Sequence, residues 1–251
     1  MTTVEFSNEF DILFNNISSN SAPGLNEYEK SVLLTKGQIE LLRNYFNPKG
    51  NKYHEGFDGS QKRQIDFSNL IKVVKPLESN IMLNVTKFDD RSIMFDIPKD
   101  VLYIINETAK VKYDGKYTNI VTITPMTFDE YSVFNSRPFR QPYKHQGWRL
   151  INKPDNSDNY TAEIIVKEGA DLSDYTIRYV RLPNPIILMD LDGDDNGESF
   201  GDLSIQGKTK KSECELDSSI HFEILQRAVE LAKNAYLGDI NSTLQLGTRS
   251  E

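Results

Sequence analysis

The stretch Val111-Lys-Tyr-Asp-Gly-Lys-Tyr117 (VKYDGKY) decides the fold class, because it predicts an antiparallel hairpin in the middle of the chain. The dipeptide Asp114-Gly115 is favoured in hairpin turns, since these turns require positive φ angles. Aromatic and β-branched residues stand on both sides of it, as is typical of paired strands. The centre of the chain is therefore predicted to be a β-sheet.

Further strands are predicted on both sides of this hairpin. Alternating, β-branched or aromatic residues indicate strands at 92–97, 101–105, 120–124, 148–151, 160–166 and 175–180. Thr127-Phe-Asp-Glu130 fits a capping box, which predicts a short helix from Phe128 to Phe134. The expected sheet has about five or six strands, and the apolar run Pro185–Asp190 also has the pattern of a strand.

Helices are predicted at both ends of the chain. Apolar residues recur at helical spacing over 3–17 and 26–46, and a Ser-, Pro- and Gly-containing break separates the two helices. Gly37 is expected to weaken the second one. A third helix over 220–236 has a continuous apolar face, with Asp217 as its cap and Gly238 at its end.

These elements predict an α+β fold, in which an N-terminal helical hairpin and the long C-terminal helix form a bundle beside a central, mostly antiparallel sheet or sandwich. Residues 1–50 and 213–237 are expected to form the bundle, 65–190 the β-rich region and 191–212 an acidic, flexible loop. Residues 238–251 are expected to be an extended tail whose anchors, Ile240, Leu244 and Leu246, need a partner surface.

The composition narrows the possible functions. No run approaches the roughly 18 apolar residues of a membrane span, and the N-terminus has no signal-peptide pattern. The single cysteine, Cys214, suits a reducing compartment. A formal net charge of −8 disfavours tight binding of nucleic acid, although an acidic surface can lie near DNA without gripping it.

No catalytic or cofactor-binding constellation is present in the sequence. His54, His145 and His221 share no metal-ligand spacing, and no phosphate loop or nucleophile elbow occurs. Cys214 lies seven residues before His221. These two residues either form a nucleophile pair or, as we expect, are a small buried residue and a helix-surface histidine. We therefore predict a protein that is not an enzyme and has no cofactor.

The acidic segment Met189–Glu198 (MDLDGDDNGE) contains half of a calcium-binding loop. Asp192, Asp194 and Asn196 occupy positions 1, 3 and 5 of an EF-hand pattern, and Gly197 occupies position 6. Position 12 is Leu203, where the pattern requires glutamate. Calcium binding by these residues is a hypothesis, and a solvated turn is the favoured interpretation.

The stretch Arg137–Arg149 (RPFRQPYKHQGWR) combines basic and aromatic residues and contains no acid. Such a mixture occurs in protein–protein interfaces and on surfaces that stack single-stranded nucleic acid. Three alternatives follow for this stretch: it contacts an acidic surface of a neighbouring copy, it is an ordinary structural loop, or it contacts nucleic acid. The candidate interface residues are Arg137, Phe139, Arg140, Tyr143, Trp148 and Arg149, together with the tail anchors.

Three stretches carry a family resemblance: residues 9–47 (EFDILFNNISSNSAPGLNEYEKSVLLTKGQIELLRNYFN), 182–191 (LPNPIILMDL) and 213–251, which begins ECELDSSIHFEILQRAVELAK. They resemble the neck ring or adaptor proteins of crAss-like tailed bacteriophages of the podovirus type. The resemblance implies a virion structural protein, made in the bacterial host cytoplasm, that forms a head-to-tail connector ring between portal and tail.

The resemblance also implies the partners. Such proteins assemble into rings of twelve copies, contact the portal and neighbouring tail or ring proteins, and surround double-stranded DNA without reading its sequence. They have no membrane partner. Acidic residues of the second helix, such as Glu27, Glu29 and Glu40, are candidates for the channel lining, and a solvated helix face is the alternative for each of them. Alternatives are another tail-ring or tail-assembly component, or a calcium- or single-strand-binding module.

Overall fold

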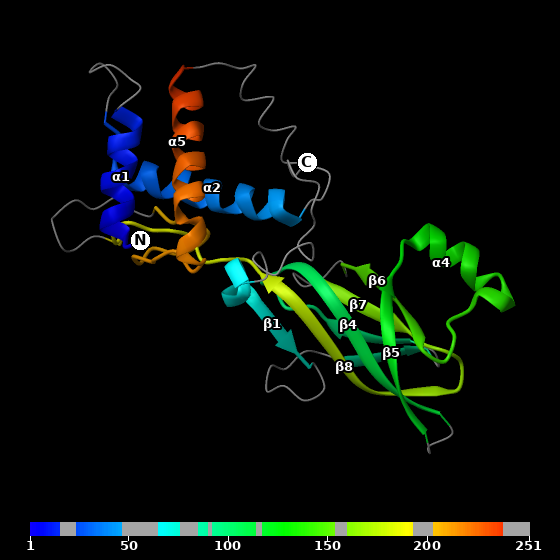
Figure 1. The fold of residues 1–251 in the computed structure, drawn as a ribbon. Coiled ribbons are helices and arrows are strands. Elements are labelled where there is room, and N and C mark those ends of the chain that lie inside the picture. The colour runs from blue at the N-terminus through cyan, green and yellow to red at the C-terminus, as the bar shows by residue number, and fades with distance from the viewer. Residues whose placement is uncertain are drawn as a thin grey trace. The chain divides into compact units, whose positions relative to one another are not determined.

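The computed structural model describes residues 1–15, 24–46, 65–75, 85–89, 92–113, 117–153, 160–192 and 203–237. The chain forms two compact units. The helical unit comprises residues 1–70 and 183–251, and the sheet unit comprises residues 71–182. Figure 1 shows that helices from both ends of the sequence meet in the helical unit. The predicted α+β class is confirmed.

The helical unit is built on three described helices: α1 (Thr3–Asn15), α2 (Glu27–Phe46) and α5 (His221–Leu237). Phe6, Phe10 and Phe14 recur every four residues along α1 and are buried, because this spacing places them on one side of a helix. Both α1 and α2 pack against α5 (Figure 1). No helix in the described ranges has the length and apolar character needed to cross a lipid bilayer.

Gly37 lies at a close approach of the α2 and α5 backbones. A Cβ atom at this position would lie 3.1 Å from both the Ala228 nitrogen and the Ile224 oxygen, which are backbone atoms of α5. The expected weakness of Gly37 within α2 is therefore accompanied by a packing role: the missing side chain lets two backbones come together.

The segment from Pro183 to Leu191 belongs to the helical unit, and the predicted strand at 185–190 is wrong. Its only ladder contact among the described residues is a single bridge between Ile187 and Ser212. Hydroxyl groups of α2 take the place of a neighbouring strand. The Ile186 N–H donates to the Thr35 hydroxyl at 3.1 Å, and the Leu188 N–H donates to the Ser31 hydroxyl at 3.0 Å.

The sheet unit contains one sheet of eight strands in the order β1-β8-β4-β5-β6-β7-β3-β2. All neighbouring pairs are antiparallel except β5 and β6. A parallel pair needs a crossover connection, and this one runs through helix α4 (Phe128–Asn135). The strands are β1 (Ile71–Val74), β2 (Val85–Asp89), β3 (Ser92–Asp96), β4 (Val101–Tyr113), β5 (Tyr117–Pro125), β6 (Gln146–Asn152), β7 (Thr161–Ile165) and β8 (Ala170–Arg181).

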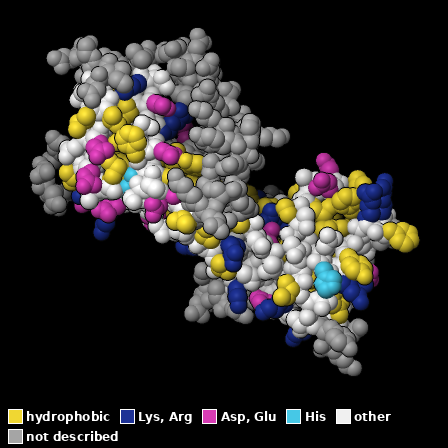
Figure 2. Space-filling view, in the orientation of Figure 1, with side chains coloured by type: hydrophobic (Ala, Val, Ile, Leu, Met, Phe, Trp, Pro, Cys, Tyr) yellow, Lys and Arg dark blue, Asp and Glu magenta, His cyan; other side chains and the backbone are white. Residues whose placement is uncertain are grey.

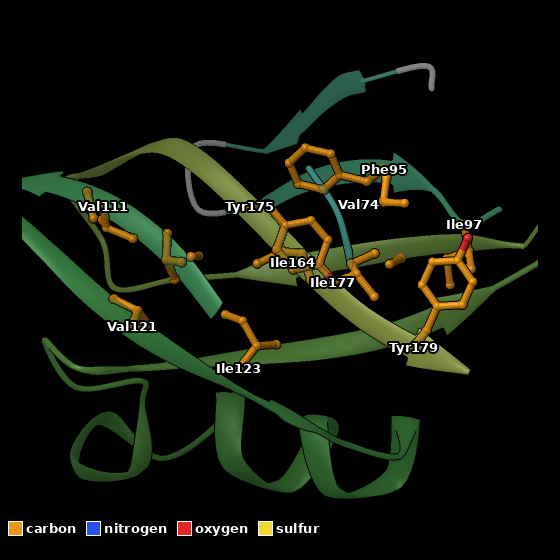
Figure 3. Packing of buried hydrophobic residues seen from close by; sticks show 14 residues of the cluster. Val74, Phe95, Ile97, Val111, Val121, Ile123, Ile164, Tyr175, Ile177 and Tyr179 are labelled. Atoms are coloured by element: carbon orange, nitrogen blue, oxygen red, sulfur yellow. The ribbon is translucent and has the colours of Figure 1, made fainter. Parts of the chain in front are cut away.

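The sheet curls around its own core. Strands β3 and β8 lie far apart in the strand order, yet the rings of Phe95 and Tyr175 are 4.9 Å apart. This contact requires one face of the sheet to be concave. Figure 3 shows Phe95 and Tyr175 beside Ile164 and Ile177 in the interior, and all four are buried. The curl therefore lets a single sheet enclose an apolar core.

Most predicted strands are confirmed, and two strands were missed. Strands β4 and β5 pair antiparallel up to Tyr113 and Tyr117, so the predicted hairpin is present, while Asp114 and Gly115 lie outside the described residues. The missed strands, β1 and β2, are the two edges of the sheet. The sheet thus has eight strands, not five or six.

Candidate functional site

Helix α4 supports a surface of the sheet unit on which several large apolar side chains are exposed. Its capping box is confirmed: the Thr127 hydroxyl accepts from the Glu130 N–H at 3.3 Å, and the Glu130 carboxylate accepts from the Thr127 N–H at 3.1 Å. The rings of Tyr131 and Phe134 pack against Trp148, 6.2 and 6.1 Å away. Phe128 remains exposed, because the helix has only one side against the sheet.

The loop after α4 adds basic and aromatic side chains to this surface. The short 3-10 helix η3 (Pro138–Arg140) holds Phe139 fully in solvent, at 102% exposure. Tyr143 is 66% exposed. The Arg140 guanidinium lies 5.3 Å from the centre of the Phe134 ring. We call the exposed residues of this region the basic aromatic surface: Phe128, Val133, Arg137, Phe139, Arg140, Tyr143 and Lys144.

Two of the candidate interface residues lie inside the sheet unit. Trp148 is only 8% exposed and anchors α4. Arg149 is 9% exposed, and its guanidinium donates to the Glu107 carboxylate at 2.7 Å. Trp148 therefore supports the basic aromatic surface from the sheet, and Arg149 points to the opposite face of β6, whereas Arg137, Phe139, Arg140 and Tyr143 are free to touch another molecule.

Glu107 is the centre of a buried polar cluster that the sequence did not indicate. It is 4% exposed and accepts hydrogen bonds from Arg149 and from the Tyr175 hydroxyl. Burial raises the pKa of Glu107 above its ordinary value, although the Arg149 charge and the Tyr175 hydrogen bond act in the opposite direction. Burial and the Glu107 charge also raise the pKa of Tyr175. Each partner comes from a different strand, so only the sheet register brings them together.

A cleft of about 430 Å³ opens beside Arg149 on the sheet unit. The Arg149 Nε atom is buried and has no hydrogen-bond partner among the described residues. Most of the cleft wall is aliphatic, so it is shaped for an apolar group rather than for acid–base chemistry. The lining residues are Ile97, Pro98, Lys99, Val101, Leu102, Tyr103, Ile104, Arg149, Ile151 and Tyr160.

Cys214 and His221 do not form a nucleophile pair. Burial raises the pKa of Cys214 to about 11, so its thiol stays protonated at neutral pH. The His221 Nε2 atom lies 3.0 Å from the Leu216 oxygen, and its Nδ1 atom lies 2.8 Å from the Met1 amino group. His221 is buried, so the prediction of a helix-surface histidine is wrong. Burial lowers the pKa of His221, and the N-terminal charge acts in the same direction.

Of the three candidate calcium ligands, only Asp192 lies within the described residues. The Asp192 carboxylate accepts from the Thr209 hydroxyl at 2.6 Å. Asp190 accepts from the Lys211 N–H, also at 2.6 Å. Asp194 and Asn196 lie outside the described residues, as do His54 and the tail anchors Ile240, Leu244 and Leu246. Within the described ranges, no group of three or more His, Cys, Asp or Glu residues is placed to hold a metal ion.

The acidic residues proposed for a channel lining are already engaged within the helical unit. The Glu40 carboxylate pairs with Arg227 of α5 at 2.7 Å. Glu27 pairs with the buried Lys30 ammonium at 3.1 Å, and Asp11 of α1 pairs with the same ammonium at 2.7 Å. The Glu29 carboxylate accepts from the Asn26 N–H at the start of α2. These contacts stabilise the packing of the helices and reduce the charge that Glu27 and Glu40 present to a channel.

Comparison with known proteins finds relatives along the whole chain. A family model described as phage tail ring protein 3/4 matches residues 1–244. The chain is 49% identical over 251 residues to ring protein 4/5 of Bacteroides phage crAss001, covering 100% of each protein. It is 34% identical over 239 residues to ring protein 3 of the same phage, covering 92% of this chain and 95% of that protein. The matches include both structural units.

Proposed function

We propose, since the chain belongs to the phage tail ring protein 3/4 family, that it is a subunit of a ring that joins the portal to the tail. Its family membership and its relatives make it a structural tail ring protein of the crAss-like type, located in the virion tail. The observation that carries the finer proposal is the match to two different ring proteins of one phage. Two related ring proteins in one virion support an arrangement in which several rings are stacked.

The proposed ring consists of copies of this chain, with twelve as the expected number. It contacts the portal and neighbouring tail or ring proteins and surrounds the DNA. The net charge of −8 supports this role, because a ring of acidic subunits repels the phosphate backbone and lets DNA pass without binding it. The side chains that face the channel would include acidic residues other than the paired Glu27 and Glu40.

The proposal assigns residues 238–251 to contact with a neighbouring protein. In the sequence, Ile240, Leu244 and Leu246 are the apolar anchors of this segment. An extended segment of this composition gains order on a partner surface, where apolar burial offsets the entropy of ordering. Deleting 238–251 is expected to leave a folded subunit that no longer enters virions. Normal incorporation of the shortened chain would contradict this assignment.

The proposed function involves no enzymatic step. In the described residues, the thiol of Cys214 is held protonated and both ring nitrogens of His221 are occupied. The buried carboxylate of Glu107 has a charge partner and a hydrogen-bond donor inside the sheet unit. These groups stabilise the fold, and each is committed to a structural contact.

The test is the mass of the purified full chain, alone and mixed with its cognate portal, by native mass spectrometry. A ring, either free or formed only on the portal, is the expected result, and its mass gives the copy number. The same measurement with and without calcium tests the alternative module. A chain that stays monomeric with the portal but binds calcium or single-stranded DNA would overturn the proposal.

A further inference from the structure

We infer that the basic aromatic surface of one copy binds the outer face of helix α1 of a second copy. The inference rests on the proposed function, because a subunit in a ring presents two different surfaces to its two neighbours. Such a head-to-tail contact joins unlike patches of identical chains and closes into a ring when the rotation allows. The structure offers two patches that complement each other in both charge and apolar character.

The first patch, the basic aromatic surface, exposes large apolar side chains on a rigid support. Phe139 and Tyr143 are 102% and 66% exposed, and Phe128 on α4 is 55% exposed. The capping box at Thr127 fixes the start of α4, and Trp148 holds the helix against the sheet. A patch that is already ordered loses little conformational entropy on binding, which favours a specific contact.

The charges of the two units are unequal. By sequence, the sheet unit has 16 basic and 15 acidic residues, whereas the helical unit has 13 basic and 22 acidic residues. The exposed cations Arg137, Arg140 and Lys144 stand in a stretch that contains no acid. An acidic surface of another copy is therefore the partner that electrostatic complementarity selects.

Helix α1 is the second patch. It contains Glu5, Glu9 and Asp11 and no basic residue. Asp11 is paired with Lys30, but in the described part of the chain neither Glu5 nor Glu9 meets a basic side chain. Figure 2 shows hydrophobic side chains bordered by acidic ones over the helices of the helical unit, and hydrophobic side chains next to basic ones near α4 on the sheet unit.

The exposed face of α1 also has apolar residues for the aromatic rings. Val4 and Ile12 are 61% and 59% exposed, while the phenylalanines of the same helix point into the core. Val4 and Ile12 are eight residues apart, so they lie about 12 Å apart along one side of the helix. Aliphatic side chains that flank carboxylates suit a patch of aromatic rings flanked by guanidinium groups, since arginine forms paired hydrogen bonds with carboxylates.

The test uses charge reversal on both sides of the proposed contact. Arg137→Glu/Arg140→Glu places negative charges against α1 and is expected to weaken self-association of the full chain at least about tenfold. Asn8→Lys/Glu9→Lys reverses the charge at Glu9, adds a cation at Asn8 and leaves the Thr2–Glu5 capping contacts intact. The variant with all four substitutions is expected to recover most of the association. Lys112→Glu/Arg178→Glu is the control, because it changes the charge of the sheet unit equally at two other exposed residues.

Association is measured by sedimentation over a concentration series, without and with the portal. Weakening by each pair and recovery in the combined variant support the contact. If the wild-type chain associates but neither pair changes the association, or if the combined variant does not recover, this contact is wrong while the ring proposal stands. If the wild-type chain stays monomeric at every concentration and on the portal, the ring proposal fails and the contact fails with it.

Discussion

The buried pair of Glu107 and Arg149 allows a quantitative prediction for the substitution Arg149→Met. Methionine fills a similar volume but leaves a carboxylate that is 4% exposed without its charge partner. Breaking a buried ion pair from one side costs about 3–5 kcal/mol, because the remaining charge stays buried. We therefore expect the free energy of unfolding of the sheet unit to fall by about this amount at neutral pH.

This loss is expected to depend on pH. Burial raises the pKa of Glu107, and the Arg149 charge opposes that rise, so the substitution raises the pKa further. A carboxyl group whose pKa is higher in the folded state gives stability that is fully present below its ordinary pKa of about 4.5 and is lost as the pH rises through the folded value. The variant is therefore expected to lose much less stability at about pH 5, since the neutral carboxyl group is cheaper to bury.

The assay is urea denaturation followed by the fluorescence of Trp148, the single tryptophan, which lies in the sheet unit and reports on that unit alone. Glu107→Gln/Arg149→Met removes both charges and keeps an acceptor for the Tyr175 hydroxyl, so it is expected to lie within about 1 kcal/mol of the wild type. Arg178→Met, at an exposed arginine of β8, is the control. A loss below about 1 kcal/mol at neutral pH, or an equal loss at both pH values, would refute the reasoning.

Three further predictions concern single side chains. Trp148→Ala is expected to destabilise the sheet unit by about 3–5 kcal/mol in thermal denaturation, whereas Phe139→Ala changes it by less than about 0.5 kcal/mol, because only Trp148 is buried. Thr127→Ala removes the cap of α4 and is expected to cost about 1 kcal/mol in the same assay, and an unchanged melting temperature would contradict this. Because the pKa of His221 is lowered in the folded state, the stability that this histidine contributes is present above its ordinary pKa of 6.5 and is lost as the pH falls through its folded-state pKa. In melts followed by circular dichroism below pH 6.5, the melting temperature should therefore fall with the pH, and it should fall less in His221→Asn. An equal dependence of the melting temperature on pH in both chains would contradict this.

The sequence allowed prediction of the elements that have a strong local signal. The hairpin of β4 and β5, the capping box of α4 and the amphipathic helix α5 all follow from residues close together in the chain. Strands β1 and β2 were missed because edge strands are short and have only one neighbour to support them. The run at 185–190 was misread because a short apolar segment has no period that separates a strand from other buried structure. The N–H groups of Ile186 and Leu188 donate to hydroxyl groups of α2 that lie 151 and 157 residues away in the chain.

The candidate site was predicted only in part, for a related reason. The basic and aromatic composition of 137–149 is visible in the sequence, but the burial of Trp148 and Arg149 depends on the order of the strands. Glu107 and Tyr175 had no signal at all, because their pairing arises across neighbouring strands. His221 was misplaced on the surface, since its partners are the Met1 amino group and the Leu216 carbonyl. The sequence could not predict which hydrophobic residues of α1 and α4 are exposed, because this depends on how each helix packs.

The division of the chain has a consequence for the order of folding during synthesis. The sheet unit is continuous in sequence, so all of its strands leave the ribosome before α5 does. The helical unit cannot be completed before α5 is made, because α2 packs against α5, which is translated only after the whole sheet. Contacts this distant along the chain form slowly. Completion of α5 is therefore the step that turns a nascent chain with an open pair of N-terminal helices into a finished subunit.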